Sequence, residues 1–149
     1  CPAMIPTDAG LIPTGEIRPI TKGDVFDFSE AKPIGQDIDK DDERLVIAAG
    51  YDHTVLLPEH DGLYTFAQAK SEKTGIIMDV ATTMPGAQFY SANFLEGKPG
   101  KQGHIYNRRD AFCIETQYVP NAVNCDKFAS PVLKAGQETH TVTTYTFSK

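Results

Sequence analysis

The chain has 149 residues, of which 40% are hydrophobic and 23% charged, and its net charge is −6 at pH 7. This composition is ordinary for a single globular domain, and it excludes an intrinsically disordered chain. Lysine and arginine are scattered rather than gathered into a basic stripe, and no apolar run is long enough to cross a bilayer, so neither nucleic acid nor a membrane is expected as a partner.

Three cysteines, Cys1, Cys113 and Cys125, make an odd count without metal-ligand spacing. We interpret them as reduced thiols of a cytoplasmic protein, with no metal site. No signal peptide opens the chain, which starts at Cys1 rather than at methionine. Either residues have been removed, or the chain is one piece of a longer protein.

The first forty residues read as ordered loop with short extended pieces, as at Ile12–Gly15 and Lys32–Gly35. The acidic segment Asp37–Glu43 resembles the start of a calcium loop. It lacks the glycine required at the sixth position, and Ala48 stands where a bidentate glutamate is needed. A solvated acidic loop is the favoured interpretation.

The rest of the chain predicts strands, because prolines and glycines separate short runs rich in β-branched and aromatic residues. The clearest pattern is the last, in which Thr139, Thr141, Thr143, Tyr145 and Phe147 would share one face. Turns between the runs favour an antiparallel all-β sandwich. The predicted strands are Leu45–Ala49, Thr54–Leu57, Tyr64–Ala69, Gly75–Thr82, Gln88–Phe94, Ala111–Thr116 and Thr139–Phe147.

Glu115 is the leading candidate for chemistry, because it is the one acid in the strand-like run Phe112–Gln117. Alternation along a strand places Cys113, Glu115 and Gln117 on the same face. A carboxylate on a partly buried sheet face is costly unless something polar binds there. The alternative is a sheet-edge glutamate that faces water.

Two further segments carry polar groups suited to a sugar. Gly50–His53 places Asp52 at the mouth of a strand, and Pro85–Tyr90 places Gln88 and two aromatic residues after a turn. Acids and amides match sugar hydroxyls, and aromatic faces stack on a pyranose. By themselves these residues are weak evidence, because all-β proteins commonly carry them.

The order of these segments and the residues within them closely resemble the C-terminal half of the aldose 1-epimerase (galactose mutarotase) family, over nearly the whole chain. The motifs that carry the resemblance are Leu11–Ile17, Phe26–Phe28, Lys32–Gly35, Gly50–His53, Thr82–Tyr90, Asn93-Phe94, Gly100-Lys101, Phe112–Gln117, Pro120–Ala122, Pro131–Leu133 and Thr144–Phe147. The resemblance implies that residues 1–149 are the C-terminal half of one large antiparallel β-sandwich domain.

The resemblance also implies a reaction, in which α and β anomers of free hexoses such as galactose or glucose interconvert through ring opening. Glu115 matches the general base that removes the C1 hydroxyl proton, and Asp52 and Gln88 match groups that bind the aldohexose. No metal or organic cofactor is implied. A glutamate is ionised at neutral pH, so Glu115 can accept a proton from a hydroxyl held within hydrogen-bond reach.

The family's catalytic histidines lie in its N-terminal half, so the resemblance implies that the acid must come from outside this chain. His53 accompanies Asp52 without being that acid, and His60, His104 and His140 lie outside the motifs. We expect an N-terminal half chain as partner, or self-association that covers exposed sheet edges.

Two alternatives stay open. The chain is a non-catalytic sugar-binding or structural remnant of the same fold, or a relative that acts on hexose phosphates. The second alternative would need cations at the phosphate, and Arg108 and Arg109 are candidates that we interpret as solvated loop residues. Phe89 and Tyr90 are interpreted as core residues rather than as a stacking surface.

Overall fold

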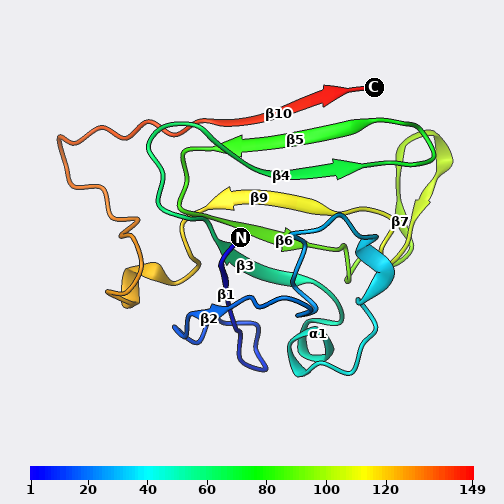
Figure 1. Ribbon diagram of the computed structural model, residues 1–149, viewed down its shortest axis with the longest axis horizontal. Coiled ribbons are helices and arrows are strands. Elements are labelled where there is room, and N and C mark those ends of the chain that lie inside the picture. The colour runs from blue at the N-terminus through cyan, green and yellow to red at the C-terminus, as the bar shows by residue number, and fades with distance from the viewer.

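The computed structural model describes residues 1–149, and its strands form three antiparallel sheets (Figure 1). The largest sheet has five strands in the order β2-β1-β3-β6-β9, the second has the order β10-β5-β4, and β7 pairs with β8. The strands are β1 (Ala3–Ile5), β2 (Arg18–Pro19), β3 (Asp52–Leu56), β4 (Tyr64–Lys70), β5 (Ile77–Thr82), β6 (Gly86–Tyr90), β7 (Lys98–Pro99), β8 (Ile105–Tyr106), β9 (Cys113–Gln117) and β10 (Thr143–Ser148). The helices are α1 (Glu43–Ala48) and the short 3₁₀ turns η1 (Ile34–Gln36), η2 (Lys101–Gly103) and η3 (Ala122–Asn124).

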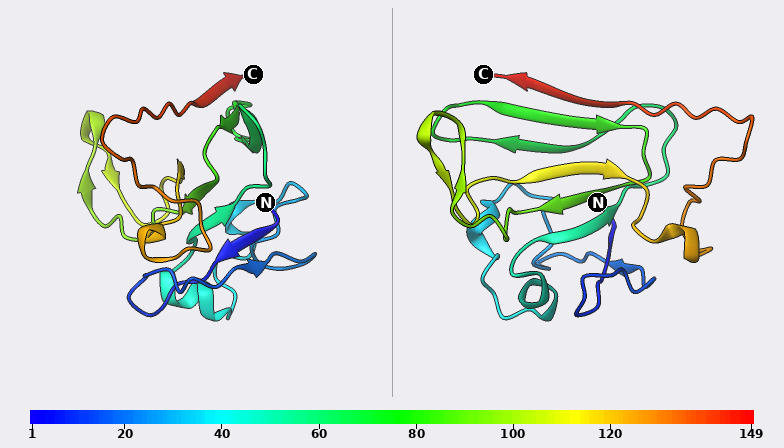
Figure 2. Two further views of the ribbon diagram at one scale, coloured as in Figure 1. Left: turned by 90° about the vertical axis from the view of Figure 1, so that its left-hand side faces the viewer. Right: turned by 180° about the vertical axis from the view of Figure 1, so that it is seen from behind.

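The three-stranded sheet lies beside the β9 end of the five-stranded sheet in each view (Figures 1 and 2). Hydrogen bonds join the two sheets: the Tyr145 hydroxyl of β10 donates to the Ile114 carbonyl of β9 at 2.7 Å. The hydroxyls of Thr116 and Thr143 are also bonded to each other. The predicted all-β antiparallel architecture is confirmed.

The five-stranded sheet has two faces with separate apolar clusters, because successive strand residues point to opposite sides. Met4 belongs to the larger cluster, which is completed by Val25, Phe26, Ile38, Leu45 and Tyr51. Its neighbour Ile5 belongs to a smaller cluster with Val119 and Ala122. We call these the large-cluster face and the small-cluster face of the sheet.

Six of the predicted strands overlap β3, β4, β5, β6, β9 and β10. The boundaries differ most at β6, which spans Gly86–Tyr90 rather than Gln88–Phe94, and at β10, which begins at Thr143 rather than Thr139. The two strands near the start of the chain, β1 and β2, lie outside the segments Ile12–Gly15 and Lys32–Gly35, where extended pieces were expected. In those segments Pro13 forms an isolated bridge with Thr7, and η1 begins at Ile34. Strand β1 lies inside the sheet between β2 and β3.

The strand predicted over Leu45–Ala49 is wrong, because these residues form most of α1. The Asp42 side chain caps the helix by accepting from the Arg44 backbone N–H at 3.0 Å. Ala49 ends it in the left-handed conformation, with φ 55°. Leu45 and Ala48 are buried three residues apart while Val46 is 61% exposed, which is helical spacing. The β-branched residues in the run concealed that spacing.

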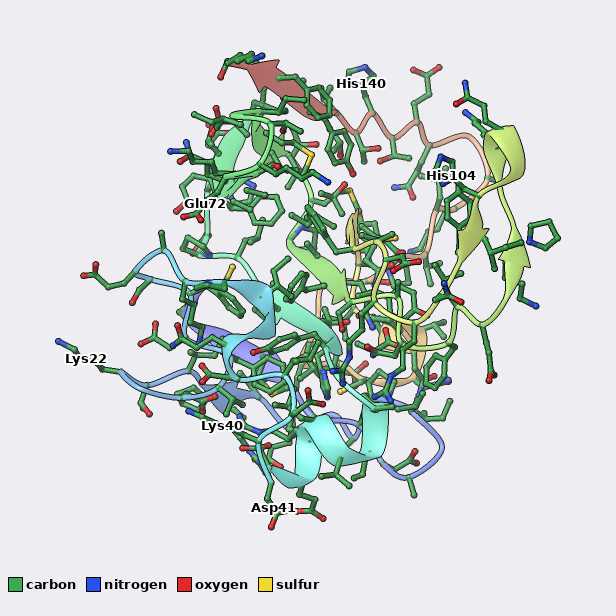
Figure 3. The ribbon with its side chains drawn as sticks, turned by 90° about the vertical axis from the view of Figure 1, so that its right-hand side faces the viewer. Lys22, Lys40, Asp41, Glu72, His104 and His140 are labelled. Carbon is green, nitrogen blue, oxygen red and sulfur yellow. The ribbon has the colours of Figure 1, made fainter.

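The solvated loop predicted for Asp37–Glu43 is only partly correct. Asp41 points into solvent (Figure 3), but Asp37 is 5% exposed and pairs with Lys32 and Lys40, each at 2.7 Å. Hydrogen bonds from these two lysines lower the pKa of Asp37. Asp37 therefore ties the acidic segment to the neighbouring loop at Lys32.

The molecule exposes a large surface for its size. Only 26 of 149 residues are buried, and the accessible surface is 9715 Å², whereas a folded monomer of this mass exposes roughly 7,500 Å². Residues 129–141, between β9 and β10, are all exposed and run along the outside of the sheets (Figure 2). No helix is long enough to cross a bilayer, since α1 has six residues.

Candidate functional site

Strand register brings the predicted site residues to the small-cluster face. Thr54 on β3 lies opposite Gln88 on β6, and Gln88 lies opposite Glu115 on β9. On its other side Thr54 is paired with Ile5 of β1. Directly paired residues of antiparallel strands share a face, so these side chains form a row across four strands.

A second row lies one step along the strands. Asp52, Tyr90 and Cys113 occupy successive paired positions on β3, β6 and β9. Each is two residues from a member of the first row, so it points to the same side of the sheet. The predicted residues Asp52, Gln88 and Glu115 therefore lie on one surface.

Two hydrogen bonds hold the Gln88 side chain: one connects the two rows, and the other lies within the first row. Gln88 Nε2 donates to Asp52 Oδ1 at 2.8 Å, and the Thr54 hydroxyl donates to Gln88 Oε1 at 2.6 Å. Thr54 is 2% exposed, whereas Asp52 and Gln88 are half-buried. The amide is therefore held on both sides before any ligand arrives.

Glu115 is exposed, and not partly buried as its sequence context suggested. It lies on β9, the edge strand of the five-stranded sheet. At this edge the carboxylate is accessible to a ligand or to a further polypeptide.

Cys113 lies near both site carboxylates, those of Glu115 and Asp52. Partial burial is the first cause that raises the pKa of its thiol, followed by the charge of the Glu115 carboxylate, a hydrogen bond to Glu115 and the charge of Asp52. The three cysteines of the chain are free. Cys113 is therefore a neutral thiol on a surface where two carboxylates converge.

An aromatic pair borders the polar side chains. Tyr90 and Phe94 have ring centroids 6.3 Å apart and nearly parallel planes, and the Tyr90 hydroxyl accepts from the Phe94 backbone N–H at 3.1 Å. Phe94 is 55% exposed. The prediction of a core position is right for Phe89, which packs on the large cluster, but Tyr90 is half-buried on the polar face.

The turn before β3 explains how Asp52 is positioned. Asn93 Nδ2 donates to the carbonyls of Ala48 and Tyr51, each at 2.9 Å, and so ties the end of α1 to the start of β3. A Cβ on Gly50 would lie 2.3 Å from Asn93 Oδ1, and its φ is +140°. Glycine at this position is therefore required for the bonds that set the direction of β3.

His53 points to the opposite face from Asp52. It is fully buried against Phe26, with ring centroids 4.8 Å apart, and its Nδ1 accepts from the Asp52 backbone N–H at 3.1 Å. Burial lowers the pKa of His53 to about 4, and the charge of Arg44 adds to this effect. His104 and His140 are exposed at the periphery (Figure 3). Thus no histidine of this chain lies in either row of the site.

The two candidate arginines are bound elsewhere. Arg108 Nη2 donates to the Ala49 carbonyl at 2.7 Å, and Arg109 pairs with Asp39 at 2.8 Å. Arg109 also lines a cavity of about 340 Å³, whose walls include Ile38 and Phe112 and none of the predicted site residues. The site is thus an open sheet surface rather than that cavity.

The surface offers both acceptors and a donor of hydrogen bonds. The acceptors are the Glu115 carboxylate and the second oxygen of Asp52, and the donor is the second N–H of Gln88. The aromatic pair lies beside them. Neutral polyhydroxy compounds suit such a surface, and Glu115 can accept a proton from one of their hydroxyls. Sequence reasoning missed Thr54 and Phe94, although the two-residue spacing from Asp52 could have identified Thr54.

The structure has no cluster of three or more His, Cys, Asp or Glu side chains able to hold a metal ion. The polar side chains that the site does bring together are two carboxylates, one amide, one thiol and two hydroxyls, those of Thr54 and Tyr90. They suit hydrogen bonding to a neutral ligand better than coordination of a cation.

Comparisons with known proteins agree with this geometry. The chain is 37% identical over 147 residues to the galactose mutarotase of Sus scrofa, a match that covers 98% of the chain and 41% of that protein. It is 33% identical over 146 residues to the aldose 1-epimerase of Escherichia coli (strain K12), covering 96% of the chain and 42% of that protein. The chain thus spans about two-fifths of the length of these relatives.

Solved structures give the same picture. An aldose epimerase homologue from C. elegans superposes with a TM-score of 0.85 at 30% identity, over 99% of this chain and 43% of that one. The galactose 1-epimerase of Lactobacillus acidophilus NCFM, at 20% identity and a TM-score of 0.67, shares the fold. The sequence profile of the aldose 1-epimerase family matches residues 3–146. The chain therefore belongs to the aldose 1-epimerase family.

Proposed function

We propose that this chain supplies the catalytic base and part of the sugar-binding surface of an aldose 1-epimerase acting on free hexoses such as galactose or glucose. The observation that carries the proposal is the Gln88–Asp52 hydrogen bond beside Glu115 on one face of the sheet. Family membership supplies the class of reaction.

In the proposed mechanism, Glu115 takes the proton of the C1 hydroxyl while an acid protonates the ring oxygen. The bond between C1 and the ring oxygen breaks, giving the open-chain aldehyde. Rotation about C1–C2 and the reverse proton transfers then close the ring as the other anomer. Asp52 and Gln88 bind hydroxyls of the sugar, and the rings of Tyr90 and Phe94 are placed to contact its apolar face.

The acid is proposed to be a histidine of an N-terminal half, because no histidine of this chain lies on the site face. The two halves would form one β-sandwich domain, of which residues 1–149 are the C-terminal half. The excess surface supports such a partner. The motif Pro131–Leu133 also supports a partner chain, because the apolar residues Val132 and Leu133 are 56% and 52% exposed. Three free thiols fit the proposed cytoplasmic location.

The alternatives make different demands on the same surface. A hexose-phosphate epimerase needs cations at the phosphate, but Arg108 and Arg109 bind the Ala49 carbonyl, and Arg109 also binds Asp39. A sugar-binding remnant without activity would keep Asp52 and Gln88 but need no partner that carries an acid. No observation favours either alternative over the epimerase.

Two measurements on the purified particle test the proposal. Native mass spectrometry, followed by denaturation of the same sample, determines whether an N-terminal polypeptide accompanies the 149-residue chain. Polarimetry then follows a freshly dissolved pure anomer of galactose or glucose. We expect a second chain, or one longer chain, and faster mutarotation than the buffer rate. A particle that contains both halves and leaves the buffer rate unchanged contradicts the epimerase reading.

A further inference from the structure

We infer that Thr54 is a positioning residue of the sugar site, which fixes the orientation of the Gln88 amide and through it the Asp52 carboxylate. The inference rests on the proposed function, since it concerns the binding surface of that same site. Thr54 itself has its hydroxyl turned toward Gln88 and away from the exposed surface, with 2% of the residue accessible.

The direction of the hydrogen bonds is determined by chemistry. A carboxylate only accepts, so the group of Gln88 that faces Asp52 must be the Nε2 amide. Its Oε1 then faces Thr54, and the Thr54 hydroxyl must donate to it. The donors run one way, from Thr54 to Gln88 to Asp52. This order leaves one N–H of Gln88 and one oxygen of Asp52 for the ligand.

The backbone and the neighbours of Thr54 fix the direction of its hydroxyl. A β-branched side chain has few allowed χ1 positions, so placing the methyl group also places the hydroxyl. The Thr54 methyl faces Gly86, where an added Cβ would lie 3.6 Å from it, an ordinary van der Waals contact. Ile5, opposite Thr54 on β1, is fully buried. Water therefore has no access to replace the hydroxyl.

The test compares Thr54→Val with Thr54→Ser in the complete protein that contains both halves. Valine keeps the shape but removes the donor, and leaves Oε1 of Gln88 without a partner. We expect KM for the aldose to rise roughly three- to tenfold, the loss expected for one neutral hydrogen bond, with kcat within about twofold of wild type. Thr54→Ser keeps the donor and restores most of the affinity.

Thr116→Val is the matched control. It removes a threonine hydroxyl that is also hydrogen-bonded, to Thr143, but on the opposite face of β9 from Glu115. A structural effect of losing any threonine hydroxyl would raise KM in both valine variants. A positioning effect raises KM in Thr54→Val alone.

A second readout does not depend on activity. The side-chain amide signal of Gln88, identified in NMR spectra by its loss in Gln88→Leu, should shift in Thr54→Val and exchange faster with solvent, and should be unchanged in Thr54→Ser. An unchanged Gln88 signal, or a changed signal with unchanged KM, overturns the inference. If wild type neither binds nor turns over an aldose, the proposed function fails, and the amide signal alone then decides whether Thr54 holds Gln88.

Discussion

At the residue scale, the two proposed sugar-binding residues are held together by a hydrogen bond, whereas the proposed base is exposed. The Gln88 and Asp52 side chains are hydrogen-bonded to each other and half-buried, whereas Glu115 is exposed at the sheet edge. A group that binds hydroxyls benefits from a fixed orientation. A group that exchanges protons with substrate needs access, which an edge strand gives.

This difference predicts the behaviour of Glu115→Gln in the complete enzyme. The amide cannot accept the C1 hydroxyl proton, so mutarotation should fall by a factor of about 10²–10⁴. Stability to urea should be nearly unchanged, because the side chain is exposed. Polarimetry and urea unfolding measure the two effects. Glu72→Gln, at another exposed glutamate (Figure 3), is the control, and a wild-type rate in Glu115→Gln would remove Glu115 from the role of base.

Because His53 is buried with a lowered pKa, we expect the folded state to lose stability in acid. Its pKa is lowered to about 4 in the folded chain, by burial and by the charge of Arg44, against a charge from Asp42 that raises it. The unfolded chain, with a histidine pKa near 6.5, therefore binds the proton first as pH falls. The folded state should lose about 3 kcal/mol between pH 6.5 and 4, and this contribution is fully present above pH 6.5.

The measurement is the free energy of unfolding in urea at pH 7 and pH 4.5, for wild type and His53→Gln. Wild type should lose more stability than the variant over that interval, since glutamine does not titrate. His104→Gln, at an exposed position, should follow wild type. Equal losses in wild type and His53→Gln would contradict a buried neutral imidazole.

At the element scale, the short helix α1 depends on Asp42, the residue that caps its N-terminus. Asp42 caps the backbone and also pairs with Arg44 at 2.7 Å, while Arg44 binds Asp24 at 3.1 Å and lies over the Phe26 ring. The helix has six residues, too few to be stable in isolation. Its cap, this ion-pair group and the packing of Leu45 therefore hold it in place.

Replacing the cap should weaken the whole fold. Asp42→Ala should lower the free energy of unfolding by about 1–2 kcal/mol, because both the cap and one partner of Arg44 are lost. Asp41→Ala, one residue earlier and exposed (Figure 3), should change it by less than about 0.5 kcal/mol. Urea unfolding of the two variants makes the comparison, and equal effects would show that position 42 has no special role.

At the scale of the whole molecule, the chain has more surface than a free monomer of its mass, and part of it is apolar. Phe147 on β10 is 65% exposed, and Leu133 lies in the fully exposed segment between β9 and β10. Such surfaces and open strand edges favour association.

The isolated 149-residue chain should therefore self-associate, and its sedimentation should depend on concentration. Leu133→Ser and Phe147→Ser together should reduce that association by removing apolar area. Val46→Ser, at a 61% exposed position on α1, is the control and should leave it unchanged. A wild-type chain that sediments as a monomer at all concentrations would contradict the proposal that a second polypeptide covers this surface.

Much of the molecule could be predicted from its sequence. Runs of β-branched and aromatic residues between prolines and glycines identified six strands, because such residues fit the pleated surface of a sheet. Alternation with a period of two gave the clearest pattern in the last of them. The same period placed Cys113, Glu115 and Gln117 on one face. The run Leu45–Ala49 failed because five apolar residues fit a strand and a helix equally well, and the cap at Asp42 decided between them.

The sequence by itself determined the all-β class and the family, and it predicted Asp52, Gln88 and Glu115 as candidate site residues, because strand patterns and sequence motifs are local properties. Only the tertiary structure decided that Asp52 and Gln88 are hydrogen-bonded to each other and that the Thr54 hydroxyl donates to the Gln88 amide. These facts depend on register between strands that are far apart in the chain. Pairing Thr54 with Gln88 and Gln88 with Glu115 brings together residues that no local pattern connects.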